Sequence, residues 1–359
     1  MIGALFRARA AELERDGRSR LYVELMRGAA DDADAGGVVA AVFAGDPATP
    51  GSVPELRLLA ALHHLVLSGD APQLARYFPS AGGDAPPQGA WPVARATIAE
   101  HADAVRALAR RTVQTNEPGR CVALYGALLW LSERHGLPIR LLEIGASAGL
   151  NLNVDRFRYV VGGRPLGDPG SPLELAEPWI GSPVPDPAAA AARLQIGERA
   201  GCDRSPIDAT THEGRLTLQS YVWPDEPERI ARVARAAAVA VRHPVSVERR
   251  NAAAWLLERL VEPRPGRLTV VWQSVVDQYL DEGERDTIRS AFASAAGGPF
   301  AWLTLEPPVE RTGEGSAFEL RCRERPEDNG SGAARLLAHA GYHGPPVAWQ
   351  VPGPGPGPG

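Results

Sequence analysis

The chain contains no lysine in its 359 residues, so all 38 of its basic side chains are arginine. A Schiff base needs a lysine amine, and the phosphate-binding loop of P-loop nucleotidases needs a lysine as well. The composition therefore excludes pyridoxal-phosphate enzymes and P-loop enzymes. A GC-rich coding bias explains the use of arginine without any functional role.

Cysteine and long apolar runs are also scarce. Cys121, Cys202 and Cys322 lie far apart and form no Cys-x-x-Cys pair, which argues against a structural zinc site or a disulfide framework and suits a reducing compartment. Residues 1–17 carry a charge every few positions, unlike a signal peptide, and no stretch approaches the roughly 18 apolar residues of a membrane span. We therefore expect a cytoplasmic protein without a membrane partner.

The composition is otherwise that of a folded globular protein, with 44% hydrophobic and 23% charged residues. The formal net charge of −5 gives no electrostatic reason to expect a nucleic-acid partner. The length allows one large core or two domains. We expect a small-molecule substrate, and the sequence leaves the oligomeric state open.

The first 138 residues show no convincing strand. Residues 53–69, 91–111 and 119–136 space their leucines and alanines three and four apart, as helices do, and Pro/Gly-rich breaks separate them. We predict an all-helical N-terminal cap domain over residues 1–138. The adjacent His63 and His64 point about 100° apart on a helix and are interpreted as structural.

From residue 139 onward, strands alternate with helices. Residues 139–144 form an apolar run that leads into a glycine turn and a short helix over 150–157. Further strands are predicted at the end of 192–202, at 215–222 and at five later runs, with a short helix over 333–340 near the end. This alternation predicts an α/β domain over 139–351 with a parallel sheet covered on both faces. Residues 352–359, PGPGPGPG, are predicted to be a disordered tail.

The turn LLEIGASAGLNL (residues 141–152) is the segment that most clearly predicts a ligand-binding site. A buried strand feeds a tight glycine turn and then a helix, so backbone N–H groups can approach a ligand. The segment resembles motif I of class I S-adenosylmethionine methyltransferases, acid-x-Gly-x-Gly-x-Gly. Glu143, Gly145 and Gly149 match this motif, whereas Ser147 stands in place of its middle glycine.

The later strands follow the order of the same family. The resemblance implies a Rossmann-like class I methyltransferase sheet of about seven mostly parallel strands, with S-adenosylmethionine as cofactor. In it, Asp203 would contact the ribose hydroxyls and Asn251 the adenine edge. The cofactor-binding residues that the resemblance implies are Glu143, Gly145, Ala146, Ser147, Gly149, Asn151, Asp203, Asn251, Gln273 and Ser274.

Residues for the acceptor side are chosen by their position. Asp277, Tyr279 and Glu306 follow strands at their carboxyl ends and are the candidate catalytic groups, with Asp277 or Glu306 as a general base. The candidate substrate-binding residues lie in loops and are Gln114, Asn116, Glu117, Trp223 and His343. Asn116 could equally cap the helix that Pro118 begins, and Trp223 could stack on adenine or on the substrate.

A second interpretation of the same turn is a serine hydrolase. G-A-S-A-G matches the nucleophile elbow Gly-x-Ser-x-Gly, with Ser147 as nucleophile and Asp277 and His343 following in the order of that fold. The helical half before the turn and the lack of an HGGG-like segment count against it. A third possibility is a non-catalytic nucleotide-binding protein that has kept the fold. We favour the S-adenosylmethionine-dependent methyltransferase.

A wider resemblance covers nearly the whole chain. The segments QTNEPGR (114–120), LLEIGASAGLNLNVDRFRY (141–159), DRSPID (203–208) and YVWPDEPERIAR (221–232) are similar to an uncharacterised bacterial family, common in actinobacteria and catalogued as domain of unknown function 2332. That family implies a methyltransferase-like fold and no established reaction.

Overall fold

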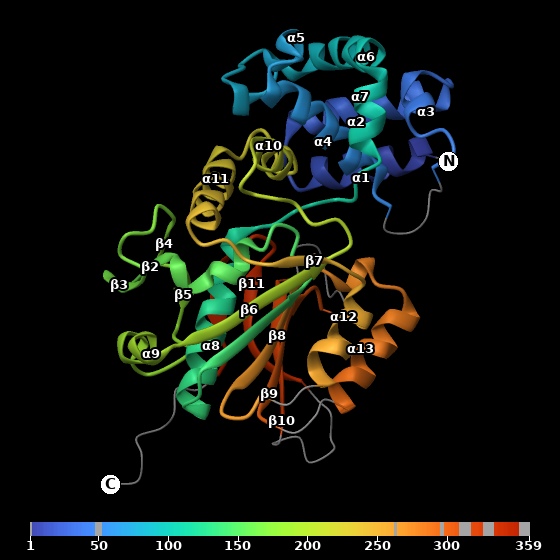
Figure 1. Cartoon of the computed structure of the whole chain (residues 1–359). Coiled ribbons are helices and arrows are strands. Elements are labelled where there is room, and N and C mark those ends of the chain that lie inside the picture. The colour runs from blue at the N-terminus through green and yellow to red at the C-terminus, as the bar shows by residue number, and fades with distance from the viewer. Residues whose placement is uncertain are drawn as a thin grey trace. The chain divides into compact units, whose positions relative to one another are not determined.

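The computed structural model describes residues 2–46, 52–261, 264–294, 298–308, 317–325 and 334–351. The chain divides into two compact units (Figure 1). The helical unit contains Met1–Thr115 and Ile207–Ala234, and the sheet unit contains Asn116–Pro206 and Arg235–Gly359. This division differs from the predicted boundary at 138/139, because α8 (Cys121–His135) belongs to the sheet unit and residues 207–234 belong to the helical unit.

Within its described residues the helical unit consists of helices and connecting loops. Most of α4 is buried because apolar side chains surround it, and Leu62 and Met26 lie in the common core. His63 is also buried there, bonded to the Ser220 carbonyl and the Ser80 hydroxyl. The main helices are α1 (Ile2–Arg15), α2 (Arg20–Asp34), α3 (Val38–Val42), α4 (Pro54–Ser68), α6 (Ala90–Glu100), α7 (Ala102–Ala109), α10 (His212–Ser220) and the beginning of α11 (Pro227–Arg242).

A mostly parallel nine-stranded sheet forms the centre of the sheet unit, in the order β5-β12-β11-β10-β9-β8-β1-β6-β7. Five neighbouring strands run parallel, and they are β9 (Phe300–Glu306), β8 (Leu268–Ser274), β1 (Ile139–Ile144), β6 (Ile196–Asp203) and β7 (Val247–Arg249). The chain moves outward from β1 to β7 and then continues on the other side of β1 with β8. The strand order therefore reverses between β1 and β8, and ligands bind at such a point in open α/β sheets.

The other four strands extend the sheet beyond β9. β10 (Phe318–Arg325), β11 (Arg335–Gly341) and β12 (Gly344–Trp349) follow as an antiparallel meander, and β5 (Trp179–Ile180) pairs with β12. Because β11 is antiparallel to β10, it runs in the same direction as β9, and its end lies at the same edge as the carboxyl ends of the parallel strands. We expected about seven strands, and β5 and β11 are the two that the prediction missed.

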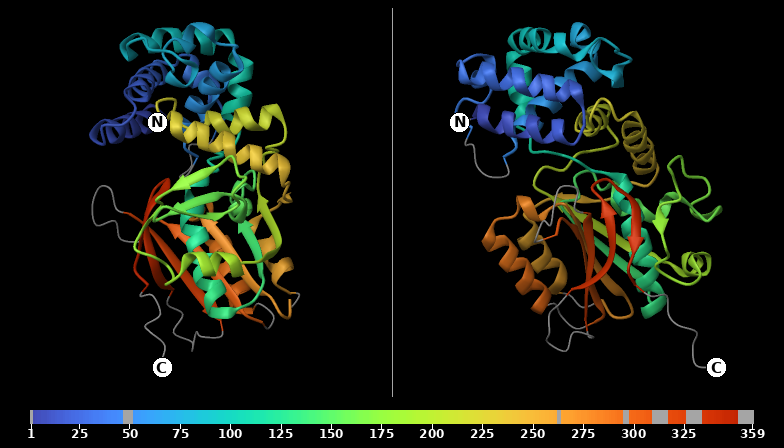
Figure 2. Two further views of the ribbon diagram at one scale, coloured as in Figure 1. Left: turned by 90° about the vertical axis from the view of Figure 1, so that its left-hand side faces the viewer. Right: turned by 180° about the vertical axis from the view of Figure 1, so that it is seen from behind.

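Helices cover both faces of this sheet (Figures 1 and 2). α12 (Ala252–Val261) and α13 (Glu282–Ser294) pack together on one face, where Trp255 and Phe292 meet Leu142 and Val271 from the strands. α8 lies along the other face and contacts β9, β11 and β12. The prediction of a sheet covered on both faces is confirmed. In the described ranges, none of the helices is both long and apolar enough to span a membrane.

An inserted segment follows the glycine turn. After the short helix η4 (Leu150–Arg156), β2 (Arg158–Val161), β3 (Arg164–Gly167) and β4 (Glu174–Ala176) form a small separate sheet. β5 and α9 (Pro187–Arg193) then lead the chain back to β6. The segment between the glycine turn and β6 is therefore a small sheet followed by a loop and a short helix.

Two predicted elements are wrong. Residues 215–222, predicted as a strand, lie mostly in α10, which begins because the Thr211 hydroxyl caps it by accepting a bond from the Gly214 amide at 3.0 Å. A helix was predicted over residues 333–340, of which residue 333 lies outside the described residues. Residues 335–340 instead belong to β11, because pairing with β10 and β12 overrides the helical preference of leucine and alanine. The predicted tail, residues 352–359, lies outside the described residues.

Candidate functional site

The turn after β1 has a backbone that requires glycine at two positions. Gly145 and Gly149 have φ of +65° and +70°. A Cβ at Gly145 would lie 2.5 Å from the side chain of Val276, and one at Gly149 would lie 2.7 Å from that of Val245. Ser147 also adopts a positive φ, +54°, which is strained for a residue with a side chain. The turn is therefore held in a tight conformation that brings backbone close to its neighbours.

Two side chains hold the amides of this turn. The Asp203 carboxylate, at the end of β6, accepts bonds from the amides of Ser147 at 2.9 Å and Ser205 at 2.7 Å. The Asn116 carbonyl oxygen accepts from the amides of Ala148 at 3.2 Å and Leu150 at 3.0 Å. Asn116 thus caps η4, whereas the helix that Pro118 begins is capped by Glu117 instead. The amide of Ala146 is bonded to the Cys202 carbonyl.

Glu143 is the buried acid of the site. Its side chain is 2% exposed, and one carboxyl oxygen accepts a bond from the Asn151 amide at 3.1 Å. Asn151 in turn accepts from the thiol of Cys121 on α8 at 3.2 Å. The other oxygen of Glu143, Oε2, has no hydrogen-bond partner within the described residues. Burial raises the pKa of Glu143 to about 8, so the group is mostly protonated at neutral pH.

Arg120 is the residue that the sequence did not single out. It is buried, and its guanidinium donates to the carbonyls of Ser274 at 3.4 Å and Tyr342 at 3.3 Å. Its positive charge opposes the upward shift of the pKa of Glu143. Arg120 therefore ties the end of β8 to the turn between β11 and β12 beside the buried acid. The only signal in the sequence was its place in the polar run QTNEPGR.

Glu117 and His343 meet at the same edge. The Glu117 side chain is fully buried, and one of its oxygens accepts the amide of Gly119 at 2.9 Å. Its other oxygen lies 3.8 Å from Nδ1 of His343, which belongs to the turn between β11 and β12. The structure thus brings Glu117, from the polar run at residues 114–117, beside His343, from a loop more than two hundred positions later in the sequence.

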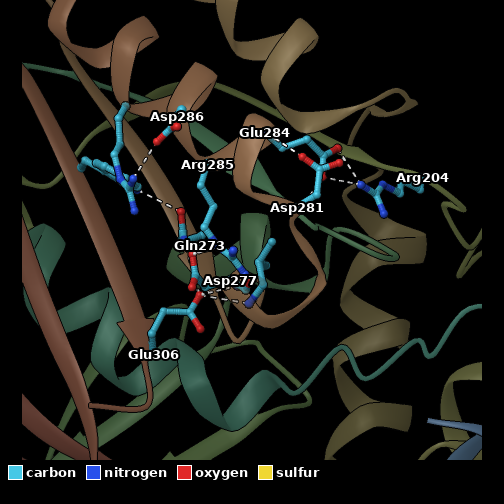
Figure 3. Close-up of polar contacts among 11 residues, drawn as sticks. Arg204, Gln273, Asp277, Asp281, Glu284, Arg285, Asp286 and Glu306 are labelled. Atoms are coloured by element: carbon cyan, nitrogen blue, oxygen red, sulfur yellow. Dashed lines mark hydrogen bonds and ion pairs between the residues drawn. The ribbon is translucent and has the colours of Figure 1, made fainter. Parts of the chain in front are cut away.

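A second polar cluster surrounds the ends of β8 and β9 (Figure 3). One Glu306 oxygen accepts bonds from the Gln273 side chain at 3.1 Å and from the amides of Val276 and Asp277 at 2.9 and 3.3 Å. Burial raises the pKa of Glu306, although these bonds oppose the shift. Asp277 is exposed and pairs with Arg285 at 3.3 Å, and Tyr279 is exposed as well.

This second cluster faces the other side of the sheet from Glu143. Glu143 is in register with Trp272, so those two side chains share a face, and the next residue, Gln273, points to the opposite face. Gln273 accepts a bond from Trp302, which packs on Phe292 of α13. The predicted catalytic groups therefore lie on the α13 side, and Glu143 lies on the α8 side.

Asn251 is used within the fold. Its side-chain oxygen caps α12 by accepting the Ala254 amide at 3.2 Å, and its amide donates to Glu284. Glu284 also holds Arg204 through two bonds of 2.5 and 2.6 Å and closes a capping box with Asp281 at the start of α13 (Figure 3). The predicted adenine contact is thus a residue that links α12 to α13.

Two predicted substrate-binding residues belong to the helical unit. Gln114 is buried and donates to the Thr112 hydroxyl at 3.2 Å. Trp223 is 9% exposed and packs against Tyr22, with ring centroids 6.0 Å apart, while the guanidinium of Arg18 lies 4.0 Å from its centroid. Trp223 is therefore part of the core of the helical unit.

The fold and the site together define an α/β protein with a large, mostly parallel sheet and a glycine turn at its switch point. The chain belongs to the family described as "Uncharacterized protein conserved in bacteria (DUF2332)", whose model matches residues 4–349. The family predicted from the sequence is thus confirmed. No curated protein and no solved structure matches the chain.

Proposed function

We propose that the chain is an S-adenosylmethionine-dependent methyltransferase that acts on a small molecule. The observation that carries this proposal is the unpartnered, buried Oε2 of Glu143 at the carboxyl end of β1. A buried polar atom without a partner costs roughly 1–3 kcal/mol, so its persistence beside a glycine turn points to a ligand that supplies the missing bond. The position at the reversal between β1 and β8 supports the same conclusion.

The neighbouring residues suit this cofactor. S-adenosylmethionine supplies an electrophilic methyl group on a sulfonium and carries a net positive charge. The carboxyl group of Glu143 would bind its ammonium, and ionisation of that carboxyl would be favoured by the positive charge. Asp203 would bind the ribose hydroxyls, because its carboxylate stands at the end of β6 beside the turn and accepts the amides of Ser147 and Ser205, and carboxylate oxygens can accept more than one bond.

Methyl transfer is an in-line displacement, so the protein has mainly to align two reactants. The tight turn and its two clamps, Asp203 and Asn116, provide a rigid surface for that alignment. Arg120, held against Ser274 and Tyr342, is the cation available for a carboxylate of the cofactor or of the substrate.

The test is calorimetric titration of the purified chain with S-adenosylmethionine and S-adenosylhomocysteine. We expect micromolar binding that weakens at least tenfold in Glu143→Gln, because the neutral amide loses the charge that attracts the ammonium. Glu55→Gln is the matched control. Glu55 is also a buried acid with a raised pKa and one unpartnered oxygen, but it lies in the helical unit. Absence of binding in folded protein would exclude the proposal.

One observation favours a second function. Ser147 has the positive φ of a strained strand-to-helix turn, as the serine of a nucleophile elbow does. Its proposed partners, however, have other neighbours: Asp277 pairs with Arg285, and His343 lies beside Glu117. Ser147 is also only 5% exposed. Labelling of the chain by a fluorophosphonate, lost in Ser147→Ala, would support the hydrolase over the methyltransferase.

A further inference from the structure

The Glu117–His343 pair has the geometry of a carboxylate that orients a histidine. The Glu117 side chain is fully buried, whereas the His343 side chain is 23% exposed. Nδ1 of His343 faces the carboxylate at 3.8 Å, so the other ring nitrogen, Nε2, is directed away from it. A carboxylate behind an imidazole fixes its tautomer and stabilises the protonated ring. The separation is longer than a hydrogen bond, as is common for catalytic pairs before a ligand binds.

The turn that carries His343 is held firmly in place. A Cβ at Gly344 would lie 2.0 Å from the carbonyl oxygen of Gly119, so the two backbones touch. The ring of Tyr342 lies edge-on to His343, with centroids 4.7 Å apart, and the Tyr342 carbonyl accepts from Arg120. Arg120 and Tyr342 are therefore among the charged or titratable groups beside the pair, and Arg120 also acts on the buried Glu143.

His343, with the Glu117 carboxyl group behind it, is better suited to accept a proton than Glu306 or Asp277. The oxygen of Glu306 that faces the end of β8 already accepts three hydrogen bonds, and Asp277 is exposed and paired with Arg285. His343, by contrast, has an exposed portion of its ring and a buried anion behind it. Histidine is also the side chain whose ordinary pKa lies nearest to neutral pH.

We propose that His343, oriented by Glu117, accepts the proton of the group that becomes methylated, which makes the substrate a hydroxyl compound or an amine. This inference rests on the proposed function. In the step, a lone pair of the acceptor oxygen or nitrogen forms a bond to the methyl carbon while the carbon–sulfur bond breaks and leaves its electrons on sulfur. The acceptor's proton passes to Nε2 of His343 and then to water. The products are the methylated acceptor and S-adenosylhomocysteine.

The experiment measures the reaction of His343 with diethyl pyrocarbonate, which modifies unprotonated imidazole, by peptide mass spectrometry between pH 5 and 8. In Glu117→Gln we expect the midpoint of this pH profile to fall by about one unit, because the anion that favours the protonated ring is gone. Glutamine still accepts the Gly119 amide, which preserves the fold. His339, on β11, is the internal control, and its profile is expected to stay unchanged.

S-adenosylhomocysteine adds the second measurement. It should slow modification of His343 at least fivefold while leaving His339 unaffected. An identical midpoint in Glu117→Gln would overturn the pairing. A shifted midpoint without protection, where calorimetry shows that S-adenosylhomocysteine is bound, would overturn the role of His343 beside the acceptor. If calorimetry shows no binding, the proposed function fails together with the acceptor assignment, and the shifted midpoint supports the proton-accepting pair alone.

Discussion

Burial of Glu143, at the end of β1, makes the stability of the folded protein depend on pH. Its pKa is about 8 in the folded chain because burial disfavours the charged form, and the ordinary value is 4.5. The folded state therefore holds this proton more tightly than the unfolded state does. The contribution of Glu143 to stability is complete below pH 4.5, declines as the pH rises towards 8 and changes little above that value.

Substitution Glu143→Gln should remove this dependence. Because glutamine resembles the protonated acid, we expect the variant to match the natural chain at pH 5 and to be more stable at pH 9, measured as the midpoint of urea unfolding. Glu324→Gln is the contrasting control. Burial opposes the ionisation of Glu324, but bonds from His135 and the charge of Arg134 lower its pKa, so this change should destabilise at neutral pH. A natural chain as stable at pH 9 as at pH 5 would contradict the assignment.

At the scale of elements, the turn between β1 and η4 requires glycine at residue 145 for two reasons. The backbone there is left-handed, and a Cβ would have no room beside Val276. Gly145 and Gly136 have nearly equal φ values, +65° and +62°, but a Cβ at Gly136 would meet nothing within 4 Å. A Cβ at Gly145 would collide with the side chain of Val276, which follows β8. Alanine at Gly136 therefore tests the left-handed backbone alone. Alanine at Gly145 tests the same backbone together with the contact with Val276.

We expect Gly136→Ala to cost about 1 kcal/mol of unfolding free energy, which is the price of the backbone conformation alone. Gly145→Ala should cost about 1–3 kcal/mol more, because the added methyl group forces Val276 and the loop after β8 to move. The same variant should bind S-adenosylhomocysteine at least tenfold more weakly. Denaturant unfolding and calorimetry provide the two measurements, and equal losses of stability in both variants would show that contact with Val276 does not matter.

At the scale of the whole molecule, the chain builds the helical unit from two separated stretches. Residues 207–234 leave the sheet unit after β6 and supply α10, which packs on α4, and Trp223, which packs on Tyr22. A core that needs both stretches cannot form from the first 115 residues alone. The sequence placed Trp223 at the ligand, whereas the fold places it in this core.

Trp223→Ala should therefore destabilise the helical unit by about 3–5 kcal/mol, the usual cost of removing a buried tryptophan side chain. Because the residue serves the core, we expect the affinity for S-adenosylhomocysteine to stay within twofold of that of the natural chain. The measurements are circular dichroism during urea unfolding and calorimetry below the transition. If Trp223→Ala bound S-adenosylhomocysteine more weakly while its stability stayed unchanged, Trp223 would belong to the ligand site and not to the core.

The sequence by itself determined what depends on local patterns. Helical spacing specified the helices at residues 53–69, 91–111 and 119–136. The strand, glycine turn and helix of residues 139–157 were evident because buried strands and positive φ leave strong marks on composition. The family was also predicted. Glu143 and Asp203 were singled out as site residues, although the bonds from Asp203 to backbone amides were not foreseen. Each of these features depends either on residues that are close together in the sequence or on sequence motifs that can be recognised without the structure.

Only the tertiary structure decided what depends on distant partners. Residues 335–341 became a strand because β10 and β12 lie on either side, and residues 212–220 became a helix with Thr211 as its cap. The structure alone placed Arg120 beside Glu143 and Glu117 beside His343, residues separated by more than two hundred positions in the second case. Pairing across a sheet and burial of a charge are set by neighbours in space, which a single sequence does not display.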